Sequence, residues 1–185
     1  MKNYFILYKP FLVFLGKFLM TYFVLTFLYE SYLNQFDPLH FEVDGFTQLV
    51  SNQSVGLQKF FGFEVHESIN NSEVCVNIFF NNRFVAKIIE GCNGLSVIIM
   101  FVAFVVAFTG NWKPTVLYII GGSLLIHLVN VFRIAVLCVL MFYYPKYEHV
   151  LHSVVFPLII YGLVFLLWVI WVNKFSVHAK KNIKK

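Results

Sequence analysis

Four long apolar stretches alternate with more polar segments along the chain. Each has roughly the 20 residues that a helix needs to cross the hydrocarbon core of a bilayer. A signal peptide is an alternative interpretation of the first stretch, but the YESYLNQ after it lacks the small residues of a cleavage site, which favours a retained anchor. The pattern therefore predicts four transmembrane helices, over residues 11–29, 93–111, 115–141 and 153–172.

The segment between the first two apolar stretches has a different pattern. Residues 44–61 have the spacing of a short amphipathic helix, with Asp44 as the predicted N-cap and Gly62 just beyond its end. FEVHE predicts a strand. Two further strands are predicted in VCVNIFFNNRFVAKII, joined by an Asn-Asn turn, because asparagine tolerates the positive φ angles of a two-residue hairpin. The segment is thus predicted to be α+β.

Composition supports a membrane environment. Hydrophobic residues make up 59% of the chain and charged residues 12%, so a soluble domain of this size could not cover its own surface. The formal net charge of +5 does not indicate nucleic-acid binding, because the basic residues lie at the ends of the apolar stretches. Three cysteines make no disulfide framework, and no Cys/His cluster has the spacing of a zinc site. We expect no metal and no cofactor.

The charges also orient the predicted spans. The segment 30–90 holds eight acidic residues against Lys59, Arg83 and Lys87. The first end of the chain, the loop after the second span and the tail hold nine lysines and no acid: Lys2, Lys9, Lys17, Lys113, Lys174, Lys180, Lys181, Lys184 and Lys185. Because basic residues are retained in the cytoplasm, both termini are predicted to be cytoplasmic and the segment 30–90 to be outside.

The predicted fold class is therefore an α-helical membrane protein with about four transmembrane helices and a small extracytoplasmic α+β segment between spans one and two. We expect that segment to pack on the membrane bundle as a cap. The predicted domains are the cytoplasmic N-terminus and first span at 1–29, the α+β segment at 30–91, a three-span bundle at 92–173 and a basic cytoplasmic tail at 174–185.

Cys92 lies where the predicted hairpin runs into the second span, between Gly91 and Gly94. An isolated cysteine near a membrane interface is usually a small hydrophobe, and Cys75 could instead pair with Cys92 on the oxidising side. The glycines would nevertheless let a substrate backbone come close. A thiol at the start of a helix and near a cation is also a good nucleophile. Cys138, inside the third span, is predicted to be core.

The third span carries a polar stripe, because His127, Asn130 and Arg133 fall within an arc of roughly 120°. Arg133 is expected about 12 Å below the outer end of that span. A charge inside a span is costly unless it is paired or faces water, which favours a functional role for Arg133. The alternative is a structural arginine bonded to helix-end carbonyls, Glu90 or Glu148. His127, about 9 Å deeper, is interpreted as structural.

Two histidines, His149 and His152, lie in the predicted outer loop before the last span. Histidine is suited to proton transfer near neutral pH, although most interfacial histidines do no chemistry. Together with Glu148 they would make only a weak metal site. The candidate cysteine, arginine and histidines all fall in the outer half of the predicted bundle and come from different helices, which packing can bring into contact.

These residues resemble a known pattern. The segment EGCNGLS at 90–96 is similar to the Cys-Ser-Gly-Leu stretch of the exosortase/archaeosortase family, and NVFRI at 130–134 matches its Asn-x-x-Arg-Ile motif. His152, followed by an apolar helix that contains Gly162, matches its third motif. The chain resembles a short member, similar to exosortase subtype F of bacteria with outer membranes. It departs from the pattern at Asn93, where the family usually has serine, and it has fewer spans before the cysteine than longer members.

The resemblance implies a membrane-embedded cysteine transpeptidase or protease of the bacterial cytoplasmic (inner) membrane, with its active site on the extracytoplasmic side. Its substrates would be exported proteins with a C-terminal sorting signal, a transmembrane helix and a basic cluster, cleaved through a thioester and transferred to a new anchor. Cys92 would be the nucleophile, Arg133 the oxyanion stabiliser and His152 the acid and base. The preference for His152 over His149 rests on the resemblance. The supporting residues would be Gly94, Asn130, Glu90 and His149.

Two other functions stay open on the residues alone. One is a non-enzymatic membrane assembly or transport subunit, with Arg133 as a structural or substrate counter-charge. The other is a membrane thiol oxidoreductase that uses Cys75 and Cys92. In each case membrane lipid is an expected partner and nucleic acid is not.

Overall fold

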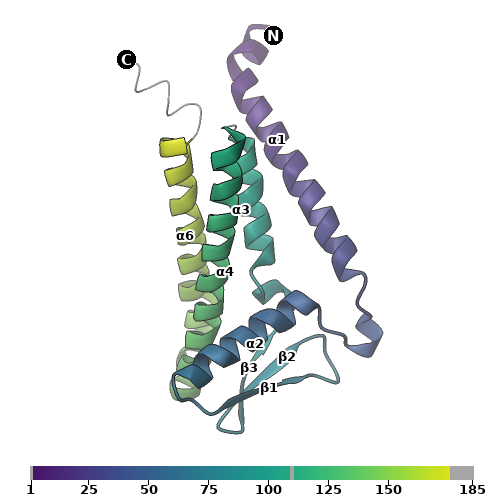
Figure 1. Ribbon diagram of the computed structural model, residues 1–185, viewed down its shortest axis with the longest axis vertical. Helices are drawn as coiled ribbons and strands as arrows, with labels where there is room; N and C mark the ends of the chain where they lie inside the picture. Colours follow the sequence, from purple (N-terminus) through teal and green to yellow (C-terminus); the bar gives the residue numbers. More distant parts are fainter. Residues whose placement is uncertain (1, 109–110, 176–185) are drawn as a thin grey trace.

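The computed structural model describes residues 2–108 and 111–175. Four long apolar helices dominate it: α1 (Lys2–Leu33), α3 (Leu95–Ala107), α4 (Trp112–Tyr143) and α6 (Phe156–Ile170) (Figure 1). The predicted tail at 174–185 is described only as far as residue 175. Its lysines at 180, 181, 184 and 185 therefore lie outside the described residues.

Three stretches among the described residues are long and apolar enough to cross a membrane: Tyr8–Leu33, Trp112–Tyr143 and Pro145–Lys174. The predicted membrane fold is confirmed. The second predicted span is shorter than expected, because α3 has 13 residues and a length of about 20 Å. Its start is fixed at Leu95 by the preceding Gly94, whose φ of 84° is left-handed and cannot continue a helix.

The three helices α3, α4 and α6 lie side by side, whereas α1 leans away from them toward its C-terminal end (Figure 1). Where α1 meets the bundle, Phe14 packs against Phe104 and Phe108 of α3, with ring centroids 5.8 and 4.5 Å apart. Phe101 of α3 approaches the backbone of α4 at Gly122, where a Cβ would lie 2.3 Å from its ring. A small residue at such a crossing lets two membrane helices pack closely.

The α+β segment has the predicted elements. Helix α2 (Gly45–Phe60) begins after Asp44, whose side chain accepts hydrogen bonds from the main-chain N–H groups of Phe46 and Thr47. Strands β1 (Val65–Ile69), β2 (Val76–Phe80) and β3 (Arg83–Ile88) form an antiparallel sheet in the order β1-β2-β3. The turn between β2 and β3 is the predicted Asn-Asn pair, with φ angles of 49° and 61°. The helix and the hairpin are therefore confirmed.

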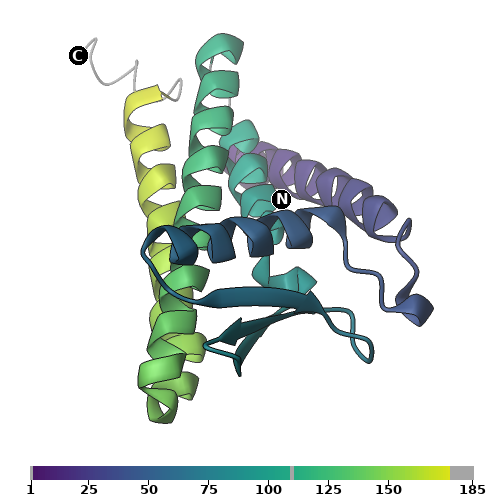
Figure 2. The ribbon, with the colours of Figure 1, turned by 60° about the horizontal axis from the view of Figure 1, so that its bottom comes forward.

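This segment is joined to the bundle chiefly through α2, which lies crosswise over α4 with the sheet beside it (Figure 2). The buried side of α2 is polar, because Ser54 and Gln58 donate to the main-chain carbonyls of Val131 and Ala135 on α4, at 3.4 and 2.8 Å. The inner face of the sheet supplies Val76, Ile78 and Phe80 to a core that also includes Ile134 and Cys138 of α4.

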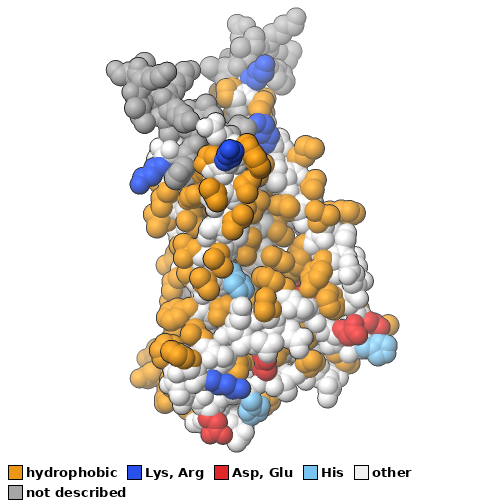
Figure 3. Space-filling view, in the orientation of Figure 1, with side chains coloured by type: hydrophobic (Ala, Val, Ile, Leu, Met, Phe, Trp, Pro, Cys, Tyr) orange, Lys and Arg blue, Asp and Glu red, His pale blue; other side chains and the backbone are white. Residues whose placement is uncertain are grey.

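Charges separate along the long axis of the molecule. On the face shown, Lys side chains gather at the end where α1 begins and α6 ends, while Asp and Glu lie at the opposite end, around α2 and the sheet (Figure 3). Between them the helices present a broad hydrophobic surface (Figure 3). This distribution has the form that the positive-inside rule describes for a membrane protein.

The predicted outer loop before the last span is helical instead. After α4 the chain forms a 3₁₀ turn (Pro145–Tyr147), the single α-turn α5 (Glu148–Val150) and a π-helical turn (Leu151–Val155) that continues into α6. Pro157 has no N–H to bond one turn back and its ring clashes with the carbonyl there, and a local widening of the helix just before the proline relieves that clash. Both candidate histidines therefore lie on a helical surface, which fixes their directions.

Candidate active site

One pocket of about 490 Å³ lies at the end of the bundle that the sheet covers. Cys92 reaches it from the turn before α3, Arg133 from α4 and His152 from the π-helical turn before α6. The structure thus brings together the three residues that were singled out for chemistry, from three separate segments. The remaining lining comes from β3, from the outer part of α4 and from the polar segment around β2.

The backbone at Cys92 is held from two sides. Its N–H donates to the carbonyl of Ile89 at 2.9 Å, and its own carbonyl accepts a hydrogen bond from Asn130 Nδ2 at 3.0 Å. Gly94 makes the second contact possible, because a Cβ at this residue would lie 3.0 Å from Asn130 Nδ2. Gly94 therefore makes room for Asn130. The side chain of Cys92 is half-buried.

The buried side chain of Asn93 forms hydrogen bonds with residues of three helices. Its Nδ2 donates to the Tyr29 hydroxyl of α1 at 3.1 Å and to Thr47 Oγ1 of α2 at 3.0 Å. Its Oδ1 accepts from the N–H of Leu95 at 2.9 Å, which caps the start of α3. The side chain is 1% exposed. The residue that departs from the family pattern thus ties α1 and α2 to the turn that carries Cys92.

Arg133 has a different environment. It lies ten residues before the end of α4 at Tyr143, a rise of about 15 Å. Within the described part of the chain, its Nε is buried without a hydrogen-bond partner and no carboxylate forms an ion pair with it. Cys92 and Tyr161 are the ionisable side chains close enough to interact electrostatically with the Arg133 guanidinium. The interpretation of Arg133 as the partner of Glu90 or Glu148 therefore has no support in the structure.

The third member of the polar stripe, His127, is turned toward α2. One ring nitrogen, Nε2, lies 2.7 Å from Gln53 Oε1, and the ring packs against Phe46 with centroids 5.6 Å apart. His127 does not line the pocket. Its contacts are those of a residue that fixes α2 on α4, which agrees with the structural interpretation.

The structure separates the two candidate histidines. His152 lines the pocket together with Glu148, which lies four residues earlier and thus one helical turn away on the same face. His149 is exposed and is not part of the lining. From the sequence, Glu148 was expected only as a partner for Arg133 or as a metal ligand. Its spacing of four residues from His152 nevertheless indicates that the two side chains share a helical face. Among residues 2–108 and 111–175, no three His, Cys, Asp or Glu side chains are placed to hold a metal ion.

Glu90 faces away from this pocket. It lines a separate hollow with Leu33 of α1 and with Asp44, the cap of α2, and it lies beside Tyr29. The distance along the chain between Glu90 and Cys92 is short, but the 3₁₀ turn Glu90–Cys92 points their side chains in different directions. Glu90 is therefore placed to act on the α1–α2 junction and not on the thiol.

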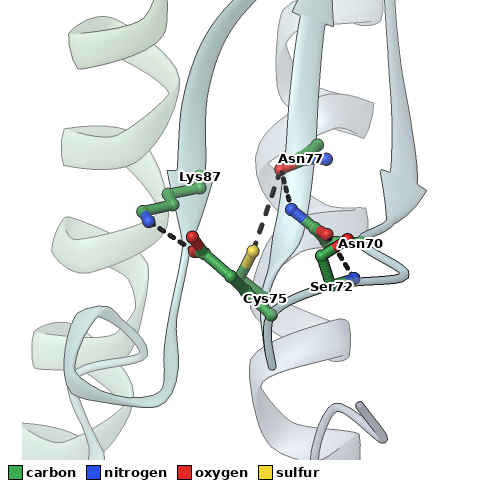
Figure 4. Close-up of polar contacts among 6 residues, drawn as sticks. Asn70, Ser72, Cys75, Asn77 and Lys87 are labelled. Atoms are coloured by element: carbon green, nitrogen blue, oxygen red, sulfur yellow. Dashed lines mark hydrogen bonds and ion pairs between the residues drawn. The ribbon is translucent and has the colours of Figure 1, made fainter. Parts of the chain in front are cut away.

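The other two cysteines are buried, and all three are free thiols. Cys75 Sγ donates to Asn77 Oδ1 at 3.8 Å, within the polar cluster shown in Figure 4. Burial and the nearby Glu73 carboxylate raise the pKa of the Cys75 thiol. Cys75 does not line the pocket, so the structure gives no support to a thiol pair with Cys92. Cys138 forms part of the pocket wall and is 1% exposed.

The far rim of the pocket is polar. Lys87 Nζ of β3 pairs with Glu73 Oε2 at 2.5 Å, and this carboxylate raises the pKa of the lysine. Asn70 Nδ2 donates to Asn77 Oδ1 at 3.4 Å and Asn70 Oδ1 accepts from the N–H of Ser72 at 2.8 Å (Figure 4). These contacts join the β1–β2 connection to β2 and β3.

The family model described as Transmembrane exosortase matches residues 8–172, which include most of α1, all of α3, α4 and α6, the sheet and all the residues that line the pocket. No individually curated protein and no solved structure matches. Because the family model covers most of the chain, the protein belongs to the transmembrane exosortase family.

Proposed function

We propose that this protein is a membrane-embedded cysteine transpeptidase that cleaves C-terminal sorting signals of exported proteins and transfers the proteins to a new anchor. The observation that carries the proposal is the pocket itself, where a half-buried thiol, a histidine and an arginine that forms no ion pair within the described residues line one cavity. These are the groups that an acyl transfer needs, namely a nucleophile, an oxyanion stabiliser and a proton carrier. Membership of the exosortase family supports the same chemistry.

In the first half of the reaction, Cys92 Sγ attacks the carbonyl carbon of the scissile peptide bond. The thiol proton goes to His152, and the oxygen of the carbonyl becomes an oxyanion that the Arg133 guanidinium stabilises. The C–N bond then breaks, and His152 returns the proton to the leaving amine. The products are a thioester between Cys92 and the exported protein, and a free C-terminal fragment that contains the transmembrane helix.

In the second half, an amine of the acceptor attacks the thioester carbon. His152 removes the proton of the attacking amine, the C–S bond breaks, and the thiolate of Cys92 recovers a proton. With water in place of the amine the same steps give hydrolysis. Arg133 acts in both halves, because each passes through an oxyanion at the same place.

The proposed location is the bacterial inner membrane, with the pocket on the extracytoplasmic side. The support is the charge distribution, in which the lysine-rich end of the helices lies opposite the end that carries the sheet and the pocket (Figure 3). A substrate whose globular part has already been exported, and whose last helix is still in the membrane, would present its cleavage site at the level of the pocket.

The test uses a reporter, an exported protein from the same genome that ends in one apolar span and a basic cluster. Its mass is measured in cells that lack the chromosomal copy of the gene and carry the wild-type chain, Cys92→Ala or Cys75→Ala. We expect the wild type and Cys75→Ala to shorten the reporter and Cys92→Ala to leave it intact. Cys75→Ala is the matched control, because it removes a thiol outside the pocket. Normal shortening by Cys92→Ala would contradict the proposal.

A further inference from the structure

Strand β3 is an edge strand. It pairs with β2 on one side, and within the described residues no other strand lies on its second side. Within residues 2–108 and 111–175, no main-chain group of residues 84–88 forms a hydrogen bond outside the pairing with β2. Unpaired N–H and C=O groups on such an edge are a template for another extended chain.

This free edge faces the candidate active site. Five successive residues of β3 line the pocket: Phe84, Val85, Ala86, Lys87 and Ile88. The pairing with β2 is irregular at Val85, but residues 86–88 pair regularly with β2. Successive side chains of a regular strand point to opposite faces of the sheet, so a cavity on one face would touch only every second one of these residues. Contact with all three of them means that the pocket extends around the edge of β3. At about 3.3 Å per residue, that edge is roughly 16 Å long.

The edge leads to the thiol. Only Ile89 separates the end of β3 from the 3₁₀ turn Glu90–Cys92, so an extended chain that follows β3 arrives at Cys92. A second wall of the groove is an apolar face of α4. It is formed by Ile134, Leu137 and Met141, which recur at intervals of three and four residues. The groove therefore has one wall of free main-chain hydrogen-bonding groups and one wall of apolar side chains.

We propose that the exported substrate binds as an additional strand on β3, and that its main chain, more than its side chains, is what the groove recognises. This inference rests on the proposed function, because the occupant is the peptide that Cys92 attacks. Strand addition obtains affinity from main-chain hydrogen bonds and specificity from pockets for alternate side chains. Here every second substrate side chain packs against the apolar face of α4 and the others face the polar rim near Lys87.

The direction of the substrate follows from the membrane. The exported part of the substrate comes first, then the scissile bond, then the span that enters the bilayer. Strand β3 has the same order, because it is followed by Cys92 and then by α3. The substrate strand thus runs parallel to β3, with the residues just before the scissile bond nearest to Ile88 and earlier residues nearest to Phe84.

The first test is a backbone scan with a synthetic peptide that copies the ten residues before the span of the reporter. Each N–H is methylated in turn, and each peptide competes with reporter processing by the full-length protein in detergent. Alternate N–H groups of a strand point toward its neighbour. We expect competition to fall roughly tenfold at every second residue, as for the loss of one well-made hydrogen bond, and to change little at the residues between.

The second test establishes the direction. In a Cys92→Ala, Cys138→Ala chain, which has no other thiol in the pocket, single cysteines replace Phe84 or Lys87, and peptides carry one cysteine at successive positions. The disulfide with residue 87 should form closer to the scissile bond than the one with residue 84. The opposite order would overturn the parallel arrangement.

These results separate the inference from the proposed function. If the reporter is shortened in a Cys92-dependent way but the methyl scan has no two-residue period, strand addition is wrong and the cysteine chemistry stands. If the scan has the period but shortening does not need Cys92, the groove binds an extended peptide and the proposed nucleophile is wrong. A scan in which only one or two scattered positions matter indicates recognition by side chains and also overturns the inference.

Discussion

The two sides of Cys92 are built in opposite ways. On one side Asn93 and Asn130 are both 1% exposed, and together they hold the turn through bonds to Tyr29, Thr47, Leu95 and Cys92 itself. On the other side the Nε of Arg133 has no hydrogen-bond partner among the described residues, and His152 is exposed at the pocket. One side is a buried network whose hydrogen bonds join three helices to the turn, with only Asn130 Oδ1 unpaired among the described residues. On the other side no hydrogen bond within the described residues holds the buried Nε of Arg133.

This difference distinguishes the residues that position the Cys92 thiol from the residues that take part in the reaction. A buried network of hydrogen bonds between distant segments fixes one arrangement of the backbone, which is what a nucleophile needs. A charge inside a membrane span without a partner is costly, and such residues are kept for function. We therefore expect substitutions on the two sides to fail differently, by loss of stability on the asparagine side and by loss of processing with an intact fold on the arginine and histidine side.

The largest effect is expected for His152→Ala. Removal of a group that carries a proton in both halves of the reaction should slow reporter processing by about 10²- to 10⁴-fold. The thermal unfolding midpoint in detergent should stay near that of the wild type, because His152 is exposed. His149→Ala is the matched control, since His149 lies three residues away outside the pocket. Equal losses for the two variants would remove the distinction between them.

A loss of about 10²- to 10³-fold is expected for Arg133→Ala, the usual result when one oxyanion donor is removed. The unfolding midpoint should not fall, because no ion pair within the described residues is lost with the charge. Arg83→Ala, at the exposed start of β3, controls for loss of an arginine. Processing within twofold of the wild type would exclude the oxyanion role.

On the other side of the thiol, Gly94→Ala should destabilise the fold by roughly 1–3 kcal/mol, because alanine is strained at a φ of 84°. The new Cβ would also press against Asn130. Gly91→Ala is the control, since nothing lies within 4 Å of a Cβ there. The comparison of unfolding midpoints tests the claim that this side is structural. An unchanged midpoint for Gly94→Ala, with lost processing, would instead place Gly94 in the chemistry.

The smallest effect concerns thiol reactivity. At neutral pH a small alkylating reagent should label Cys92 before Cys75, because Cys92 is half-buried and Cys75 is fully buried. Since burial and Glu73 raise the pKa of Cys75, its thiolate forms at higher pH than that of an ordinary thiol, and its labelling should increase only at alkaline pH. Peptide mapping after timed labelling measures both rates. Faster labelling of Cys75 at neutral pH would contradict this ranking.

The parts that the sequence predicted well are set by neighbours along the chain. Asp44 caps a helix through the N–H groups two and three residues on, and the Asn-Asn pair turns a hairpin through its own φ angles. Such features depend on a few successive residues, so pattern alone was sufficient.

What the sequence did not predict depends on contacts between distant segments. Asn93 was noticed only as a departure from a motif, because its partners lie 46 and 64 residues away. The helical form of 145–155 also decides that His152 and not His149 reaches the pocket, whereas a loop would have left both possible. The edge of β3 in the active site could not be predicted either, since strand signals do not give the position of a strand relative to α4.

The most direct test of the central claim is to isolate the acyl-enzyme. Purified wild-type protein and, in a separate sample, the His152→Ala variant are incubated with the reporter. Each reaction is stopped with acid, and its products are analysed by intact mass and peptide mapping. We predict a covalent adduct of the N-terminal reporter fragment on the peptide that contains Cys92, released by hydroxylamine as a thioester would be. An adduct on another residue, or cleavage of the reporter by Cys92→Ala, would contradict the account.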